Sequence, residues 1–338
     1  MKILLKWLVM FAGGGAIAIL AFYLWATAST YPSDRYAEIL TYGEPPPPTA
    51  SDTLTVVSYN IGYLSGLTNA GSNSDATVEV SQSLFDQNLA TAIAALAPLN
   101  ADVIALQEID LASKRSYHVN QVQKLAESLG ISSGAIAVNW DKNYVPFPYW
   151  PLQAHFGKTL AAQAILSRHP IQKNDRIVLE KVAGNPFYYN ALYLDRLAQV
   201  SEIEVGGRAL VMINVHLEAF DNPTRLNQTQ VVKDLAERYA QDHPVLLVGD
   251  FNSAVNRDQE GADKSIRLLT ESAQLSPAVL ADRWSETDQF TFPSDVPAYK
   301  LDYIFYTPET IEMIATRVVT DAAQASDHLP LAMTFRFK

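Results

Sequence analysis

The 338-residue sequence contains no cysteine, which excludes disulfides, thiol catalysis and zinc–thiolate sites. Positive charge is also scarce, because 25 lysines and arginines stand against 36 aspartates and glutamates, for a formal net charge of −11. No global basic field therefore draws the protein towards nucleic acid, although a local basic groove could exist. No internal repeat is visible, and 48% apolar composition is enough for the core of one large α/β domain with an extension.

The N-terminus lacks charge over a long stretch, from residue 7 to residue 33. As a helix, Trp7 to Trp25 alone would span about 28 Å, close to the hydrocarbon thickness of a bilayer. Lys2 and Lys6 precede this run, so the positive-inside rule predicts a single-pass anchor over residues 1–33 with a cytoplasmic N-terminus. The alternative is a signal peptide cleaved near Ala26-Thr27-Ala28, followed by secretion. In both interpretations the rest of the chain is exported.

The remaining chain divides into a linker over residues 34–53 and a catalytic domain over residues 54–338. The linker contains GEPPPP, which predicts an extended, semi-rigid spacer. In the domain, apolar patterning and caps predict strands at 54–61, 102–108, 160–167, 198–204, 209–216 and 244–249, with helices at 82–97, 118–129 and 223–240. Asn222 is the expected cap of the last helix, and residues 143–157 are expected to form an aromatic loop.

Six short motifs rich in acids, amides and histidine follow the apolar runs: SYNIG at 58–62, LQEID at 106–110, NVHLE at 214–218, GDFNS at 249–253, LDYIF at 301–305 and SDHLP at 326–330. A strand-end aspartate taken alone is more often a turn or cap residue, and a lone histidine in an apolar run is more often part of the core. Six such motifs together predict a site at one rim of a sheet sandwich. Its candidate residues are Asn60, Glu108, His216, Asp250, Asn252, Asp302, Asp327 and His328.

These residue types suit the hydrolysis of a phosphate ester, which requires charge neutralisation on the phosphoryl oxygens and an activated water. Hard oxygen ligands such as Glu108 and Asp327 favour Mg²⁺ or Mn²⁺ over zinc. His328 suits a general base whose second ring nitrogen is held by a carboxylate, and Asp302 is the candidate carboxylate. The sequence therefore predicts a metal-assisted hydrolase.

In their order and their residues, the motifs resemble those of the endonuclease/exonuclease/phosphatase superfamily, from about Leu54 to the C-terminus. The resemblance implies a DNase I-like, four-layer α/β/β/α sandwich. It also implies a Mg²⁺ site in which Glu108 is the main ligand, with Asn60 and Asp327 nearby.

The same resemblance implies catalytic roles for five residues. His328, paired with Asp302, would activate water or grip the phosphate, and His216 would stabilise the transition state. Asp250 and Asn252 would orient the nucleophile and the phosphate. Asp250 and His328 are both candidates for the general base, of which His328 is favoured.

Four further residues are candidates for substrate contact. Gln163 stands where many family members carry an asparagine, and its amide could donate to a phosphate oxygen. Arg225 could reach a phosphate, although a solvated helix arginine is the commoner case. Tyr149 and Trp150, in the aromatic loop, would either contact a ligand or cover the edge of the sandwich.

The favoured function is an exported, membrane-tethered, Mg²⁺-dependent phosphodiesterase acting on a lipid headgroup or another small phosphodiester. The glycine-rich signature of the inositol-polyphosphate 5-phosphatases is absent, which counts against an inositol phosphate monoester. The alternative is a DNase I-like endonuclease outside the cytoplasm, against which the acidic composition weighs only weakly. A non-catalytic scaffold ranks last, because every expected metal and base residue is present. No protein partner can be inferred from the sequence.

Overall fold

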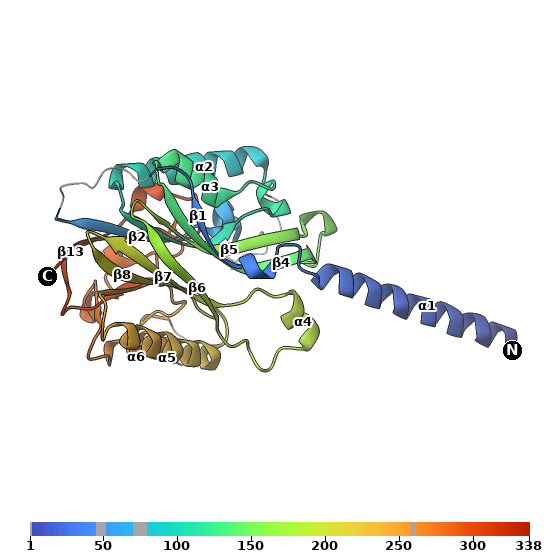
Figure 1. Ribbon diagram of the computed structural model, residues 1–338. Coiled ribbons are helices and arrows are strands. Elements are labelled where there is room, and N and C mark those ends of the chain that lie inside the picture. Colours follow the sequence, from blue (N-terminus) through green and yellow to red (C-terminus); the bar gives the residue numbers. More distant parts are fainter. Residues whose placement is uncertain (1, 45–51, 70–79, 258–260) are drawn as a thin grey trace.

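The computed structural model describes residues 2–44, 52–69, 80–257 and 261–338. Two β-sheets pack face to face, and helices cover the outer face of each (Figure 1). α2 (Gln82–Leu96) and α3 (Gln121–Leu129) lie on one side, and α5 (Asn222–Tyr239) and α6 (Lys264–Thr270) on the other. This arrangement confirms the four-layer α/β/β/α sandwich.

The first sheet has seven strands, in the order β1 (Ala37–Thr41), β4 (Ser133–Val145), β5 (Gly157–Ser167), β3 (Val103–Asp110), β2 (Leu54–Asn60), β13 (Leu331–Phe337) and β12 (Ile311–Val318). The second has six, in the order β10 (Ser276–Pro277), β11 (Asp302–Tyr306), β9 (Val245–Asp250), β8 (Arg208–His216), β7 (Leu197–Val205) and β6 (Ile171–Val178). The pairs β2/β3 and β8/β9 are parallel, and the other pairs of neighbouring strands in the described residues are antiparallel.

The parallel pairs bring distant motifs to one rim. α2 connects β2 to β3, and α5 connects β8 to β9, so the carboxyl ends of each pair lie side by side. Along the second sheet, His216 lies opposite Asp250, and Asp250 lies opposite Asp302. Three apolar layers hold this frame, one between the sheets and one beneath each helical layer.

Several local predictions need correction. The sequence predicts a linker over residues 34–53, but Ala37–Thr41 form the edge strand β1, which pairs with β4. The proline run at residues 45–48 lies outside the described residues. β4 itself was not predicted, and it extends to Val145, so the aromatic loop begins later than expected. The cap of α5 is Asp221, whose side chain accepts the Thr224 N–H, and Asn222 is the first helical residue.

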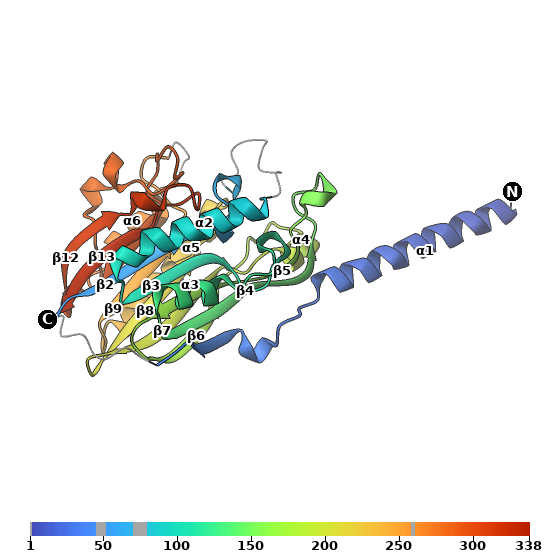
Figure 2. The same ribbon diagram turned by 90° about the horizontal axis from the view of Figure 1, so that it is seen from above.

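α1 (Lys2–Thr27) projects away from the sandwich as a separate rod (Figure 2). Its segment Ile3–Thr27 is long and apolar enough to cross a membrane, and it is the one such helix among the described residues. Signal sequences share this property. Its C-terminal end is attached to the domain. Asn143 donates from its backbone to the Ala28 carbonyl and from its side chain to the Trp25 carbonyl. The ring of Tyr23 packs edge-on against Phe187 of α4 (Phe187–Leu192).

Candidate active site

Glu108 reaches the site because β3 is interrupted by a bulge. The pairing of β3 with β5 shifts by one residue between Leu106 and Ile109, and Glu108 has a φ of 51°. A bulge bends its strand and re-aims a side chain, and a positive φ in a residue other than glycine is uncommon outside such places. Gln107 therefore points between the sheets, where it donates to Asn214, while Glu108 points to the rim.

The GDFN segment depends on Gly249. A Cβ there would lie 2.0 Å from the Val215 carbonyl oxygen, and the φ of 139° suits glycine. This close approach of β9 to β8 places Asp250 beside His216, with 3.6 Å between Asp250 Oδ2 and His216 Nε2. Asn252 follows with a φ of 51°, and its side chain donates to the Leu217 carbonyl.

His328 and Asp302 form the expected pair. The Nδ1 atom of His328 lies 2.9 Å from Asp302 Oδ2, and both side chains are buried. The other ring nitrogen, Nε2, lies 3.7 Å from Asp250 Oδ2. Burial alone would lower the pKa of His328, but the carboxylates of Asp302 and Asp250 raise it to about 10.

Acids are crowded at this rim. Burial raises the pKa of Asp250 to about 6, and the neighbouring Asp302 adds to the rise. Burial, together with Glu108, raises the pKa of Asp327 to about 7. Concentrated buried negative charge of this kind would be relieved by a cation.

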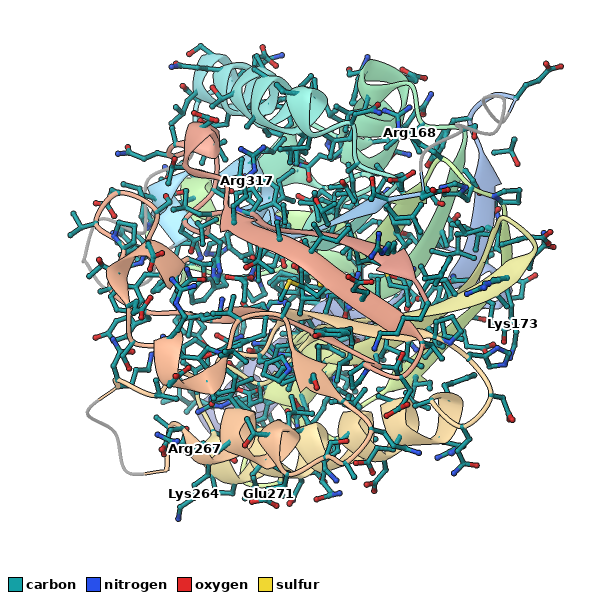
Figure 3. The ribbon with its side chains drawn as sticks, turned by 90° about the vertical axis from the view of Figure 1, so that its left-hand side faces the viewer. Arg168, Lys173, Lys264, Arg267, Glu271 and Arg317 are labelled. Carbon is teal, nitrogen blue, oxygen red and sulfur yellow. The ribbon has the colours of Figure 1, made fainter. Side chains whose placement is uncertain are left out.

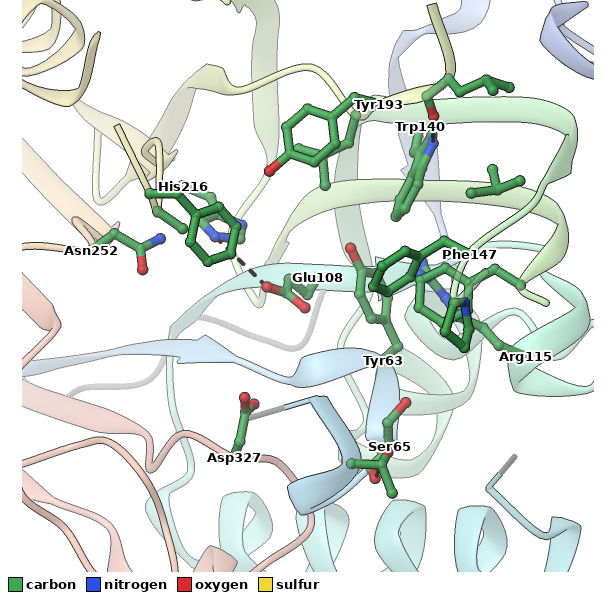
Figure 4. Close-up of a pocket in the computed structure, with 18 of the residues that line it drawn as sticks. Tyr63, Ser65, Glu108, Arg115, Trp140, Phe147, Tyr193, His216, Asn252 and Asp327 are labelled. Carbon is green, nitrogen blue, oxygen red and sulfur yellow. Dashed lines mark hydrogen bonds and ion pairs between the residues drawn. The ribbon is translucent and has the colours of Figure 1, made fainter. Parts of the chain in front are cut away.

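The donor set fits a divalent metal in two ways. Asp250, Asp302 and His328 each offer a ligand atom within 4.8 Å of the others. Glu108 and Asp327, which both line the cavity, offer further hard oxygen atoms (Figure 4). Asn60 places its amide nitrogen, not its oxygen, between the carboxylates, at 3.3 Å from Glu108 and 2.9 Å from Asp250.

His216 is buried beside the acids, and its Nε2 lies 3.7 Å from Glu108 Oε1 (Figure 4). Burial lowers the pKa of His216 well below its ordinary value, and the cationic Arg196 and His328 lower it further. The imidazole is therefore neutral at pH 7. A neutral imidazole can donate one N–H to an oxyanion without needing a counterion of its own.

These residues open into a cavity of about 1140 Å³. One part of its wall carries six of the candidate site residues: Glu108, His216, Asp250, Asn252, Asp327 and His328. The other part is aromatic, and Figure 4 shows Tyr63, Trp140, Phe147 and Tyr193 grouped to one side of Glu108. The site is thus a charged end and an apolar chamber in one continuous space.

Three of the four predicted substrate residues do not line the cavity. Gln163 is fully buried between the sheets and donates to the Asn214 carbonyl, so it does not line the cavity. Arg225 is also buried, and its guanidinium donates to the Glu218 and Ala219 carbonyls and to Asn222, so it is neither solvated nor at the cavity wall. Tyr149 lines the cavity, whereas Trp150 lies outside its wall with 73% of its surface exposed.

The structure adds residues that the sequence argument missed. Arg196, directly before β7, lines the cavity beside His216, and Tyr63 lines it beneath Arg115. The guanidinium carbon of Arg115 lies 3.3 Å from the centre of the Tyr63 ring, and the same group makes a two-point hydrogen bond with Asp110. Tyr63 directly follows the SYNIG motif, but no motif marks Arg196 or Arg115, which reach the cavity through the tertiary fold.

The chain is similar to several known proteins in sequence or in fold. Residues 57–328 match the endonuclease/exonuclease/phosphatase family. A UPF0294 protein of Vibrio cholerae is 31% identical over 131 residues, which is 38% of this chain and only 41% of that relative. Among solved structures, an endonuclease/exonuclease/phosphatase from Beutenbergia cavernae has a TM-score of 0.60 at 20% identity, over 84% of this chain and 72% of that one. A mannosyl-6-phosphatase from Bacteroides thetaiotaomicron has a TM-score of 0.58 at 16% identity, over 84% of this chain and 100% of that one.

Proposed function

Because this chain belongs to the endonuclease/exonuclease/phosphatase family, whose members hydrolyse phosphoesters, we propose that it is a metal-dependent phosphodiesterase held at a membrane by α1. We further propose that it acts outside the cytoplasm on a lipid headgroup or another small phosphodiester. The observation that carries the proposal is the single cavity that joins the acidic catalytic end to an aromatic chamber.

In phosphoester hydrolysis, each polar side chain at the charged end of the cavity would have a distinct role. Family enzymes generally depend on a divalent metal, and Mg²⁺ or Mn²⁺ held by Glu108 and Asp327, near Asn60, would neutralise the phosphoryl oxygens. His216, being neutral, would donate to the oxyanion that develops on the phosphoryl group. Asn252 lies at the same wall and would position the phosphate.

The proton of the attacking water would go to the His328–Asp250 pair. Their facing atoms are 3.7 Å apart, so protons bound by one change the affinity of the other, and the pair titrates as a unit. Asp302 fixes which ring nitrogen of His328 faces Asp250. A bound cation would lower the pKa values of both groups, because it offsets the surrounding carboxylates. That shift would make the pair a proton acceptor near neutral pH, with His328 favoured and Asp250 as the alternative.

The placement of exposed aromatic rings supports a membrane surface as the source of substrate. Within the described part of residues 52–338, the exposed aromatic side chains all belong to the 146–156 loop, to α4 or to the segment after β8: Phe147, Tyr149, Trp150, Phe187, Tyr188, Tyr189 and Phe220. We call these seven residues the aromatic rim. Five of them also line the cavity, and Phe187 touches α1. Amphipathic rings partition favourably into the bilayer interface.

The opposite end of the molecule has a different character. Figure 3 views the end remote from α1, where charged side chains such as Lys173, Arg267 and Arg317 are distributed over the surface. Charged groups favour water, whereas the aromatic rim would favour the lipid interface. The asymmetry supports an orientation in which the cavity mouth faces the membrane that α1 enters.

The junction between α1 and the domain supports a retained anchor over a cleaved signal peptide. Ala26 is only 1% exposed, and the Thr27 carbonyl accepts a hydrogen bond from Lys142. Asp141 accepts hydrogen bonds from the backbone of Thr30 and Tyr31 directly afterwards. Cleavage near Ala28 would remove the contacts that Trp25, Ala26 and Thr27 make with the folded domain.

A substrate comparison tests the proposal. The full-length protein, reconstituted with Mg²⁺, would be assayed against bis-p-nitrophenyl phosphate, p-nitrophenyl phosphate, duplex DNA and phospholipid vesicles. We expect diester and vesicle lipid to be cleaved faster than the monoester or DNA. EDTA should abolish activity, Mg²⁺ or Mn²⁺ should restore it, and Glu108→Gln should sharply raise the metal concentration required.

Two outcomes would overturn parts of the proposal. Rapid, salt-sensitive cleavage of DNA with no turnover of vesicle lipid would replace the lipid reading with the nuclease, since phosphate-backbone binding weakens steeply with salt. Full activity of the wild-type protein after exhaustive chelation would remove the metal from the mechanism.

A further inference from the structure

Arg196 is a buried cation in the wall of the cavity with hydrogen-bonding capacity left over. It directly precedes β7, is 5% exposed and lines the cavity with His216, Glu108 and Asp250. We propose that the Arg196 guanidinium binds a non-bridging oxygen of the substrate's phosphoryl group. This inference rests on the proposed function, and it identifies the phosphate-binding side chain within the same site.

The hydrogen bonds of Arg196 are incomplete. Its Nη2 donates to the Tyr193 hydroxyl at 3.3 Å, whereas Nε and Nη1 are buried and find no acceptor among the described residues. The nearest carboxylate oxygen, on Glu218, is 3.7 Å from Nε, too far for a hydrogen bond. A buried cation with unused N–H groups is costly unless a ligand supplies acceptors. The phosphoryl group of a substrate in the cavity is an acceptor of the right charge.

Arg196 also remains charged where it lies. Burial alone would lower the pKa of its guanidinium, but Tyr193 and Glu218 raise it, and the net effect is a rise. The planar guanidinium offers several N–H groups in a fixed plane, which suits the oxygens of a phosphate better than an ammonium does.

The other buried arginines near the site do not offer the same chemistry. Arg115 lines the cavity but is neutralised by two hydrogen bonds to Asp110, each of 2.9 Å. Arg225 uses its guanidinium on loop carbonyls and lies outside the cavity wall. Arg196 therefore combines contact with the cavity, charge and the absence of a hydrogen-bonded carboxylate.

The test compares Arg196→Lys and Arg196→Met with the wild-type full-length protein. Two quantities would be measured: kcat/KM on bis-p-nitrophenyl phosphate, and the Kd for inorganic phosphate by calorimetry. We expect Arg196→Met to lose roughly 10²- to 10³-fold in kcat/KM, the scale for removing one donor to a developing oxyanion. Arg196→Lys should lose roughly tenfold or more, because the planar fork is gone. Phosphate affinity should weaken by roughly tenfold or more in both, since a charge-assisted contact is lost or distorted.

The matched control is Arg176→Lys. Arg176 is a partly buried arginine held by the Val138 carbonyl and Asp195, and it does not line the cavity. Its replacement should leave both quantities unchanged. If Arg196→Met loses its cooperative thermal transition, Arg196→Lys, which keeps the positive charge, decides the question.

The outcomes separate this inference from the proposed function. If the wild-type protein hydrolyses the diester and both Arg196 variants keep its rate and phosphate affinity, the inference is wrong and the function stands. If phosphate binds in an Arg196-dependent way but no phosphodiester is hydrolysed, the inference stands and the proposed function is wrong.

Discussion

The orientation of His328 depends on one carboxylate, since Asp302 holds its Nδ1 at 2.9 Å. We predict that His328→Ala loses roughly 10²- to 10⁴-fold in kcat, the usual contribution of general acid–base catalysis. Asp302→Asn should lose much of the same activity, because the imidazole would lose its orienting anion. The measurement is steady-state hydrolysis of a soluble diester by each single variant and by the double variant.

The double variant distinguishes a dyad from two independent groups. If the residues act together, the double variant should be hardly slower than His328→Ala. A loss equal to the product of the two single losses would contradict the dyad. His169→Ala is the matched control, because His169 makes a similar contact of 3.1 Å with Asp102 and neither residue lines the cavity.

At the scale of single residues, the sequence predicted the charged end of the site but not its surroundings. Five of the eight motif residues lie near or just after the ends of β2, β3, β8 and β9 as predicted, whereas Asp302 begins β11 and Asp327 and His328 precede β13. The structure nevertheless brings all eight to one rim. Arg196 precedes a strand and belongs to no motif, and Tyr63, although it directly follows the SYNIG motif, is not an acid, amide or histidine. Gln163 was misplaced because its sequence position says nothing of which face of β5 it occupies.

At the scale of the elements, strands with strong apolar runs were predicted well and strands that depend on neighbours were not. β3, β8 and β9 lie in the interior of their sheets, and most of their residues are buried. β1 is a short edge strand next to a proline run, so its composition resembles a linker, and tertiary contacts stabilise it: its pairing with β4 and the packing of Leu40 against the core. The bulge in β3 leaves no periodic signal either, although it aims Glu108.

A group of hydrogen-bonded polar side chains lies between the sheets, and it explains why Gln163 is buried there. Asn214 receives a hydrogen bond from Gln107 and donates to Gln199, while Gln163 donates to the Asn214 carbonyl at 2.8 Å. We predict that Gln163→Met lowers the free energy of unfolding by about 1–2 kcal/mol, because a buried carbonyl loses a donor. Denaturant unfolding would measure the loss, and kcat and KM on a soluble diester should not change. A tenfold rise in KM with an unchanged free energy of unfolding would show instead that Gln163 contacts the substrate.

At the scale of the whole molecule, α1 joins the domain beside the aromatic rim. Tyr144, at the end of β4, contacts the rings of both Phe22 and Trp25, so the helix enters the domain beside the 146–156 loop. A helix anchored in a bilayer would therefore hold the aromatic rim close to the interface, and the cavity mouth with it. The charged end, which shares the cavity with five residues of the aromatic rim, would then be within reach of a lipid headgroup.

This arrangement predicts a difference between substrates in a membrane and in solution. Trp150 and Phe187 are 73% and 77% exposed, belong to the aromatic rim and do not line the cavity. Trp150→Ala combined with Phe187→Ala should lower hydrolysis of vesicle lipid roughly tenfold, a loss of about 1.4 kcal/mol of interfacial binding. Hydrolysis of bis-p-nitrophenyl phosphate should be spared. The matched control is Leu280→Ala with Val296→Ala, two exposed apolar residues that are not part of the aromatic rim or the cavity wall.

The vesicle activity of the wild-type protein should persist in high salt, because salt screens contacts between charges but not the insertion of apolar rings. Equal losses on vesicles and on the soluble diester would show that the two rings support the catalytic fold and do not bind the interface.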